Sequence, residues 1–62
     1  MSKLTPYQRR LRARAITIEM KARSLEHDIA DAFGEGSQSW NIASDITDRA
    51  AELTEAIESH ET

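Results

Sequence analysis

Apolar residues recur along this chain at alternating spacings of three and four residues, in two stretches on either side of a short glycine-containing segment. The recurring positions of the first stretch are Leu4, Leu11, Ala15, Ile18, Ala22, Leu25, Ile29 and Ala32. Those of the second stretch are Ala43, Ile46, Ala50, Leu53, Ile57 and His60. Such spacing gathers side chains along one face of a helix, and that face must pack against another helix. The pattern therefore predicts two helices that share an apolar seam.

Capping residues predict the bounds of the first helix. Thr5 can cap its start, Pro6 fits the first helical position, and Gln8 completes a capping box. No other Gly or Pro occurs before Gly34, which stands where a left-handed cap residue is expected. The first helix is therefore expected at about 6–33, a length of about 42 Å at 1.5 Å per residue.

The segment that follows predicts a turn and a second helix. Residues 34–39 contain two glycines and two serines, and their number is typical of a helix–helix connection. Either Ser37 or Ser39 can cap the second helix. We expect that helix at about 40–59, within a single domain that spans residues 1–62.

Laid antiparallel, the two helices place the seam positions opposite one another in one consistent register. The predicted layers pair Leu11 with His60, Ala15 with Ile57, Ile18 with Leu53, Ala22 with Ala50, Leu25 with Ile46, and Ile29 with Ala43. Small residues face large ones in most layers and two alanines meet at the centre, so the helices can approach closely. The predicted fold is an all-α antiparallel two-helix hairpin with an alanine-containing heptad seam, a coiled-coil type of packing.

Two helices alone leave one side of every apolar layer open to water. The chain has 62 residues and no cysteine. Below roughly 70–80 residues a fold usually needs a disulfide, a metal or a second subunit. Two hairpins that pair into a four-helix bundle would cover the seam, so we expect a homodimer. A monomer of modest stability and a hairpin completed by a different protein are the alternatives.

This layout resembles that of the Rop family of plasmid copy-number regulators. The resemblance covers length, hairpin form and alanine-containing layers across most of the chain. It implies a hairpin that dimerises into a four-helix bundle and an RNA partner. It does not extend to a functional motif that can be carried over residue by residue, and architecture alone does not carry function.

Charge is divided sharply between the two parts of the chain. Residues 1–23 carry seven Lys or Arg and one Glu, a net charge of +6, whereas residues 24–62 carry one Arg and ten Asp or Glu, a net charge of −9. Such polarity indicates a charged partner. In an antiparallel hairpin, however, the basic start of the first helix also lies beside the acidic end of the second. The two parts could neutralise each other, with Arg12 near Glu61.

A second apolar stripe lies on the first helix, nearly opposite the seam, at Ala13, Ile16 and Met20. Scattered exposed apolar residues are ordinary, but an apolar centre rimmed by arginines is typical of a protein interface. We therefore expect a small non-enzymatic regulatory factor that docks on a protein with an acidic surface, using Ile16 and Met20 as apolar anchors. The candidate partner-binding residues are Arg9, Arg10, Arg12, Arg14, Ile16, Met20 and Arg23.

Two other functions use the same charges. In a Rop-like nucleic-acid-binding regulator the arginine cluster would contact phosphates with a salt-sensitive affinity. Against this, the isoelectric point is near 5.2, and the acidic outer face of the second helix would repel a phosphate backbone. In a structural subunit, the basic and acidic parts would hold a larger helical assembly together.

No motif indicates catalysis or a cofactor. Gly34-Glu35-Gly36-Ser37 lacks the Lys of a phosphate-binding loop, and no cysteine is available as a nucleophile. His27 with Asp31, and His60 with its neighbouring glutamates, are weak metal-binding combinations. We expect no enzyme activity, cofactor, metal or small-molecule substrate.

Membrane segments are not indicated either. Apolar runs reach only two residues, far below the roughly 20 that a membrane span requires, and no secretory signal pattern is present. The expected location is the cytoplasm, with no membrane partner. A chain this small without catalytic groups is typical of the accessory factors that phages and plasmids encode to modulate host proteins.

Overall fold

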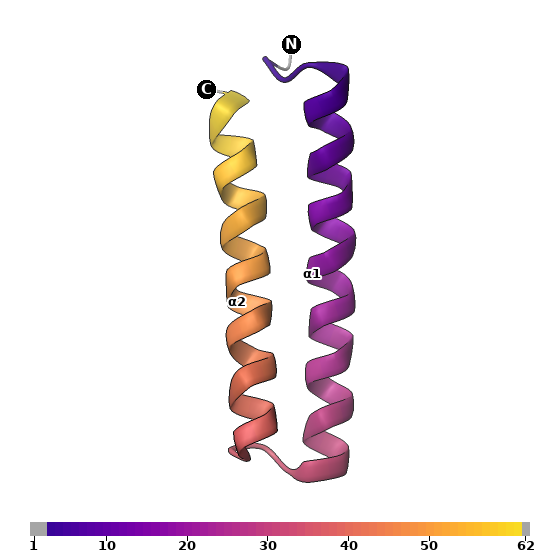
Figure 1. The fold of residues 1–62 in the computed structure, drawn as a ribbon, viewed down its shortest axis with the longest axis vertical. Helices are drawn as coiled ribbons and strands as arrows, with labels where there is room; N and C mark the ends of the chain where they lie inside the picture. Colours follow the sequence, from indigo (N-terminus) through magenta and orange to yellow (C-terminus); the bar gives the residue numbers. More distant parts are fainter. Residues whose placement is uncertain (1–2, 62) are drawn as a thin grey trace.

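The structure, a computed structural model, describes residues 3–61, with the side chain of Glu61 left out. It contains helix α1 (Pro6–Phe33), helix α2 (Gln38–Glu58) and a final 3-10 turn, η1 (Ser59–Glu61). The two long helices lie side by side and run in opposite directions, with their connecting loop at one end (Figure 1). All regular structure in the described residues is helical, which confirms the predicted all-α hairpin.

The start of α1 has the predicted capping box. The backbone N–H of Gln8 donates to the hydroxyl oxygen of Thr5 at 3.1 Å, and the backbone N–H of Thr5 donates to Oε1 of Gln8 at 2.9 Å. Pro6 occupies the first turn, where a missing N–H leaves no hydrogen bond unmade. The helix therefore begins at the residue that the sequence pattern indicates.

Two glycines turn the chain between the helices. Gly34 has a φ of 91° and Gly36 a φ of 87°, a backbone region that residues with a Cβ rarely adopt. The N–H of Gly34 donates to the carbonyl of Ala30 at 2.9 Å and closes α1. Ser37 then caps α2 by accepting from the N–H of Trp40 at 3.2 Å. Because Ser37 rather than Ser39 is the cap, α2 begins two residues earlier than expected.

The core between the helices consists almost entirely of small side chains. Its members are Ala15 and Ala22 of α1 and Ala43, Thr47, Ala50 and Thr54 of α2. Leu4, just before α1, is also buried. Alanine and threonine side chains reach only a short distance from the backbone, so helices that meet through them can approach closely. Four alanines of the predicted seam are therefore confirmed as core residues, whereas the fifth, Ala32, is exposed.

Four large residues of the predicted seam lie beside this core rather than inside it. Ile18, Leu25, Ile46 and Leu53 are each between 49% and 53% exposed. Thr47 and Thr54 are buried, whereas Ile46 and Leu53, the residues that precede them, are not. This half exposure agrees with the expectation that one side of every apolar layer stays open to water. The burial of Thr47 and Thr54 was not predicted: the two helices meet through their smallest residues, and the larger side chains lie at one flank.

Candidate protein-docking surfaces

The displaced side chains form a continuous surface along one side of the hairpin, which we call the apolar face. It consists of Leu11, Ile18 and Leu25 from α1 and Ile42, Ile46, Leu53 and Ile57 from α2. On each helix these residues are separated by four or seven positions, so they share one side of it. Leu11 and Ile57 are half-buried, and the other five are exposed. The face runs along a hairpin 44 Å long and 15 Å wide.

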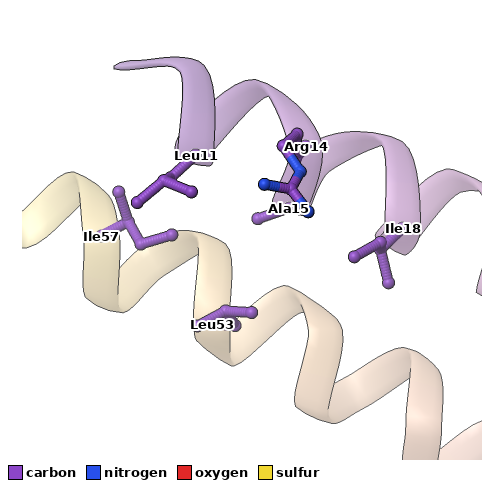
Figure 2. A pocket seen from close by; sticks show the side chains of 6 residues that line it. All are labelled: Leu11, Arg14, Ala15, Ile18, Leu53 and Ile57. Carbon is purple, nitrogen blue, oxygen red and sulfur yellow. The ribbon is translucent and has the colours of Figure 1, made fainter. Parts of the chain in front are cut away.

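Both helices contribute to a hollow in the apolar face. It has a volume of about 300 Å³ and is lined by Leu11, Arg14, Ala15, Ile18, Leu53 and Ile57. Figure 2 shows the apolar side chains of α1 directed toward those of α2 across this hollow, with Arg14 at its side. The grouping agrees with the predicted register, in which Ala15 lies opposite Ile57 and Ile18 opposite Leu53.

Arg14 and Ile18 also line a second hollow, which opens on α1 alone. Its volume is about 370 Å³, and its other lining residues are Ala13 and Thr17. Arg14 therefore borders the apolar face on the side that is remote from α2. Arg10, one helical turn earlier, lies on the same side of α1. Its guanidinium carbon is 5.9 Å from the centroid of the Tyr7 ring, a cation–π contact.

The remaining predicted site residues form a second surface on the other side of α1, which we call the basic surface. It consists of Arg9, Arg12, Ile16, Met20 and Arg23. Ile16 follows Arg9 by seven residues and Arg12 by four, so these side chains are neighbours on the helix. Ile16 is 38% exposed and Met20 is 66% exposed. The structure thus divides the predicted site: five residues share one side of α1, and Arg10 and Arg14 lie on the other.

The arginines of the basic surface differ in their surroundings. Nη2 of Arg23 donates to Oε2 of Glu19 at 2.9 Å, within one helix. The side chain of Glu19 is only 21% exposed, whereas that of Arg23 is 59% exposed. Arg12 is half-buried, and Arg9 is exposed. The proposed contact of Arg12 with Glu61 lies outside the described residues, because the side chain of Glu61 is not described.

The sequence pattern left one side of the seam open to water, but it did not include Ile42 and did not place Thr47 and Thr54 in the core. One signal was present: Thr47 and Thr54 share the seven-residue spacing of Ala43 and Ala50. Threonine can enter a helical core when its hydroxyl donates to the carbonyl four residues earlier. Both threonines do so, at 3.1 and 3.2 Å.

Neither helix has, in its described residues, a stretch long and apolar enough to cross a membrane. Within the same residues, no three His, Asp or Glu side chains form a group that could hold a metal ion. Comparisons of the chain with known protein families, with curated proteins and with solved structures found no match.

Proposed function

We propose that this protein is a small non-enzymatic regulatory factor that binds another protein through the basic surface of α1. The observation that carries this proposal is the exposure of Ile16 and Met20, one turn apart, in the middle of three arginines. An apolar centre with a charged rim is the usual composition of a protein interface. The partner would present an apolar pocket surrounded by carboxylates.

We further propose that the protein acts as a homodimer, in which two hairpins join through their apolar faces into a four-helix bundle. One whole side of the hairpin, 44 by 15 Å, covers about 660 Å², close to the about 800 Å² that each partner contributes to a standard stable interface, and the apolar face is the central part of that side. The core of one hairpin contains mainly alanine and threonine, so most of the large apolar side chains are covered only when a second copy binds.

These two surfaces do not compete with each other. The apolar face and the basic surface lie on opposite sides of α1, so a dimer formed through the first leaves the second open. A dimer would therefore present two basic surfaces, one on each protomer. Arg23 is held by Glu19 in the unbound protein, and a partner carboxylate would share or replace that contact.

The test begins with a partner protein that is captured from cell extract, identified and purified. Titration then measures its dissociation constant with the wild type and with a double variant. Ile16→Glu with Met20→Glu should weaken binding at least about 100-fold, because each anchor of an interface is typically worth 2 kcal/mol or more. The matched control adds the same charge on α2 by Gln38→Glu with Asn41→Glu, two exposed positions. This control should bind like the wild type.

Full binding by the Ile16 and Met20 variant would overturn the proposal. So would saturable binding of labelled duplex DNA or structured RNA at physiological salt that is lost when Arg9, Arg10, Arg12 and Arg14 are replaced by Gln. That second result would support the phosphate-binding alternative.

A further inference from the structure

We infer that the second copy occupies the apolar face with its loop at the opposite end, so that α1 packs against α1 and Arg14 of each protomer pairs with Asp28 of the other. This inference rests on the homodimer proposed above and adds its orientation. What carries it is the placement of charge along the border of the apolar face.

The border of the apolar face on α1 is a charged stripe of Arg14, Lys21 and Asp28, spaced seven residues apart in an uninterrupted helix. Each of the three is three or four positions from the neighbouring apolar residues Ile18 or Leu25, so the stripe follows the face along its length. Arg14 lines the same hollow as Ile18 (Figure 2). Read from the N-terminus, the stripe carries two positive charges and then a negative one.

An arrangement with the loops at opposite ends places this stripe against its own reversed copy. Arg14 then meets the second copy's Asp28 at two symmetric places, while Lys21 lies at the two-fold axis and faces the second copy's Lys21. The same two-fold rotation places Ile18 opposite the second copy's Leu25, so apolar residues also meet apolar ones. Opposite charges at a border steer association and select one orientation over another.

The corresponding positions on α2 are Arg49 and Ala56 together with Ile42, which is itself part of the apolar face, again seven residues apart. With the loops at opposite ends, Ile42 meets the second copy's Ala56, and Arg49 lies at the axis, where it faces the second copy's Arg49. Nη1 of Arg49 already donates to Oε2 of Glu52 at 3.1 Å, which offsets part of its charge.

The alternative arrangement has both loops at the same end, with α1 packed against α2 of the other protomer. Lys21 would then face Arg49 at two symmetric places, so this arrangement has as many like-charge contacts as the first. Arg14 would face Ala56, and Asp28 would face Ile42, so neither would gain a partner. The two arrangements therefore differ in the surroundings of Arg14 and Asp28, since charges beside apolar residues lose solvation without a compensating contact. The charge pattern therefore favours the loops at opposite ends.

Charge exchange tests the pairing. Arg14→Asp and Asp28→Arg, made singly, should each raise the dimer dissociation constant about tenfold, since each converts two attractive contacts into repulsive ones. The two changes together should restore it to within about threefold of the wild type, as measured by sedimentation. Arg9→Asp and Asp48→Arg, single reversals at exposed positions away from this border, are the controls and should change it little. Failure of the double variant to recover would overturn the pairing.

A distance measurement on an otherwise unchanged chain tests the orientation independently of charge. The chain has no cysteine, so Glu35→Cys places a single spin label in the exposed loop of each protomer. Loops at opposite ends should separate the labels by about the 44 Å length of the hairpin. Loops at the same end would lie within about 20 Å, because neighbouring helices pack 8–10 Å apart. A short distance in a dimer would overturn the orientation and leave the dimer standing, whereas a monomeric mass at every concentration would overturn both.

Discussion

At the scale of single residues, this hairpin depends on side chains that are small rather than strongly apolar. The hydroxyls of Thr47 and Thr54 donate to carbonyls of their own helix, at Ala43 and Ala50, so neither enters the core without a hydrogen bond. In the described residues no buried side-chain N or O lacks a partner. Burial of threonine is therefore possible here at little cost.

Ala22 provides the test at this scale, because it is buried at the centre of the hairpin. Ala22→Leu should lower the free energy of unfolding by about 1–3 kcal/mol, since a larger side chain would force the helices apart. Ala13→Leu, at an exposed position on the same helix, is the matched control and should change it by less than about 0.5 kcal/mol. Urea denaturation at one fixed protein concentration measures both. Equal stability of the two variants would show that the alanine core is not closely packed.

At the scale of the elements, the helix ends are specified by local hydrogen bonds. The capping box at Thr5 begins α1, and Ser37 begins α2 through its bond to the N–H of Trp40. These contacts join residues three positions apart, so they are independent of how the helices pack. This is why the start of α1 could be predicted from the sequence.

Two identical substitutions on α1 separate capping from helix propensity. Thr5→Ala removes the hydroxyl that accepts from Gln8 and should lower the free energy of unfolding by about 1 kcal/mol. Thr17→Ala, at an exposed position in the middle of the helix, should leave it unchanged or raise it slightly, because alanine has the higher helix propensity. Thermal unfolding followed by circular dichroism compares them. Equal losses in the two variants would contradict the capping role.

At the scale of the whole molecule, the hairpin exposes a larger share of its bulky apolar side chains than it buries. Nine large hydrophobic residues of the described chain are exposed, and the core holds mainly alanine and threonine. Hydrophobic stabilisation is roughly proportional to the apolar area removed from water, so one hairpin by itself gains little of it. Stability should therefore depend on the second copy.

A homodimer melts at a temperature that rises with protein concentration. A tenfold increase should add about 1.4 kcal/mol per dimer, or roughly 5 °C for a chain of this size. Ile18→Lys with Leu53→Lys, on the apolar face, should abolish this dependence and lower the melting temperature. Ile16→Lys with Met20→Lys, on the basic surface, is the matched control and should preserve it. A melting temperature independent of concentration in the wild type would contradict the homodimer.

The candidate site was predicted in part. The sequence identified Ile16 and Met20 as an apolar pair among arginines, because helical spacing alone places them together. Helical spacing also separates Arg10 and Arg14 from Arg9, Arg12 and Arg23. The tertiary structure adds which side of α1 packs against α2 and which side borders the apolar face.

The sequence by itself determined the elements: two helices, the start of the first, the glycine turn, and four of the five seam alanines as buried residues. Each of these depends on caps, backbone conformations or spacings within a few residues. Only the tertiary structure decided that Thr47 and Thr54 enter the core while Ile46 and Leu53 remain half exposed. A heptad pattern defines a broad stripe on a helix, but the rotation of that helix about its axis depends on the side chains that pack against it. Here the smallest residues of both helices met, and the large ones were left as a surface.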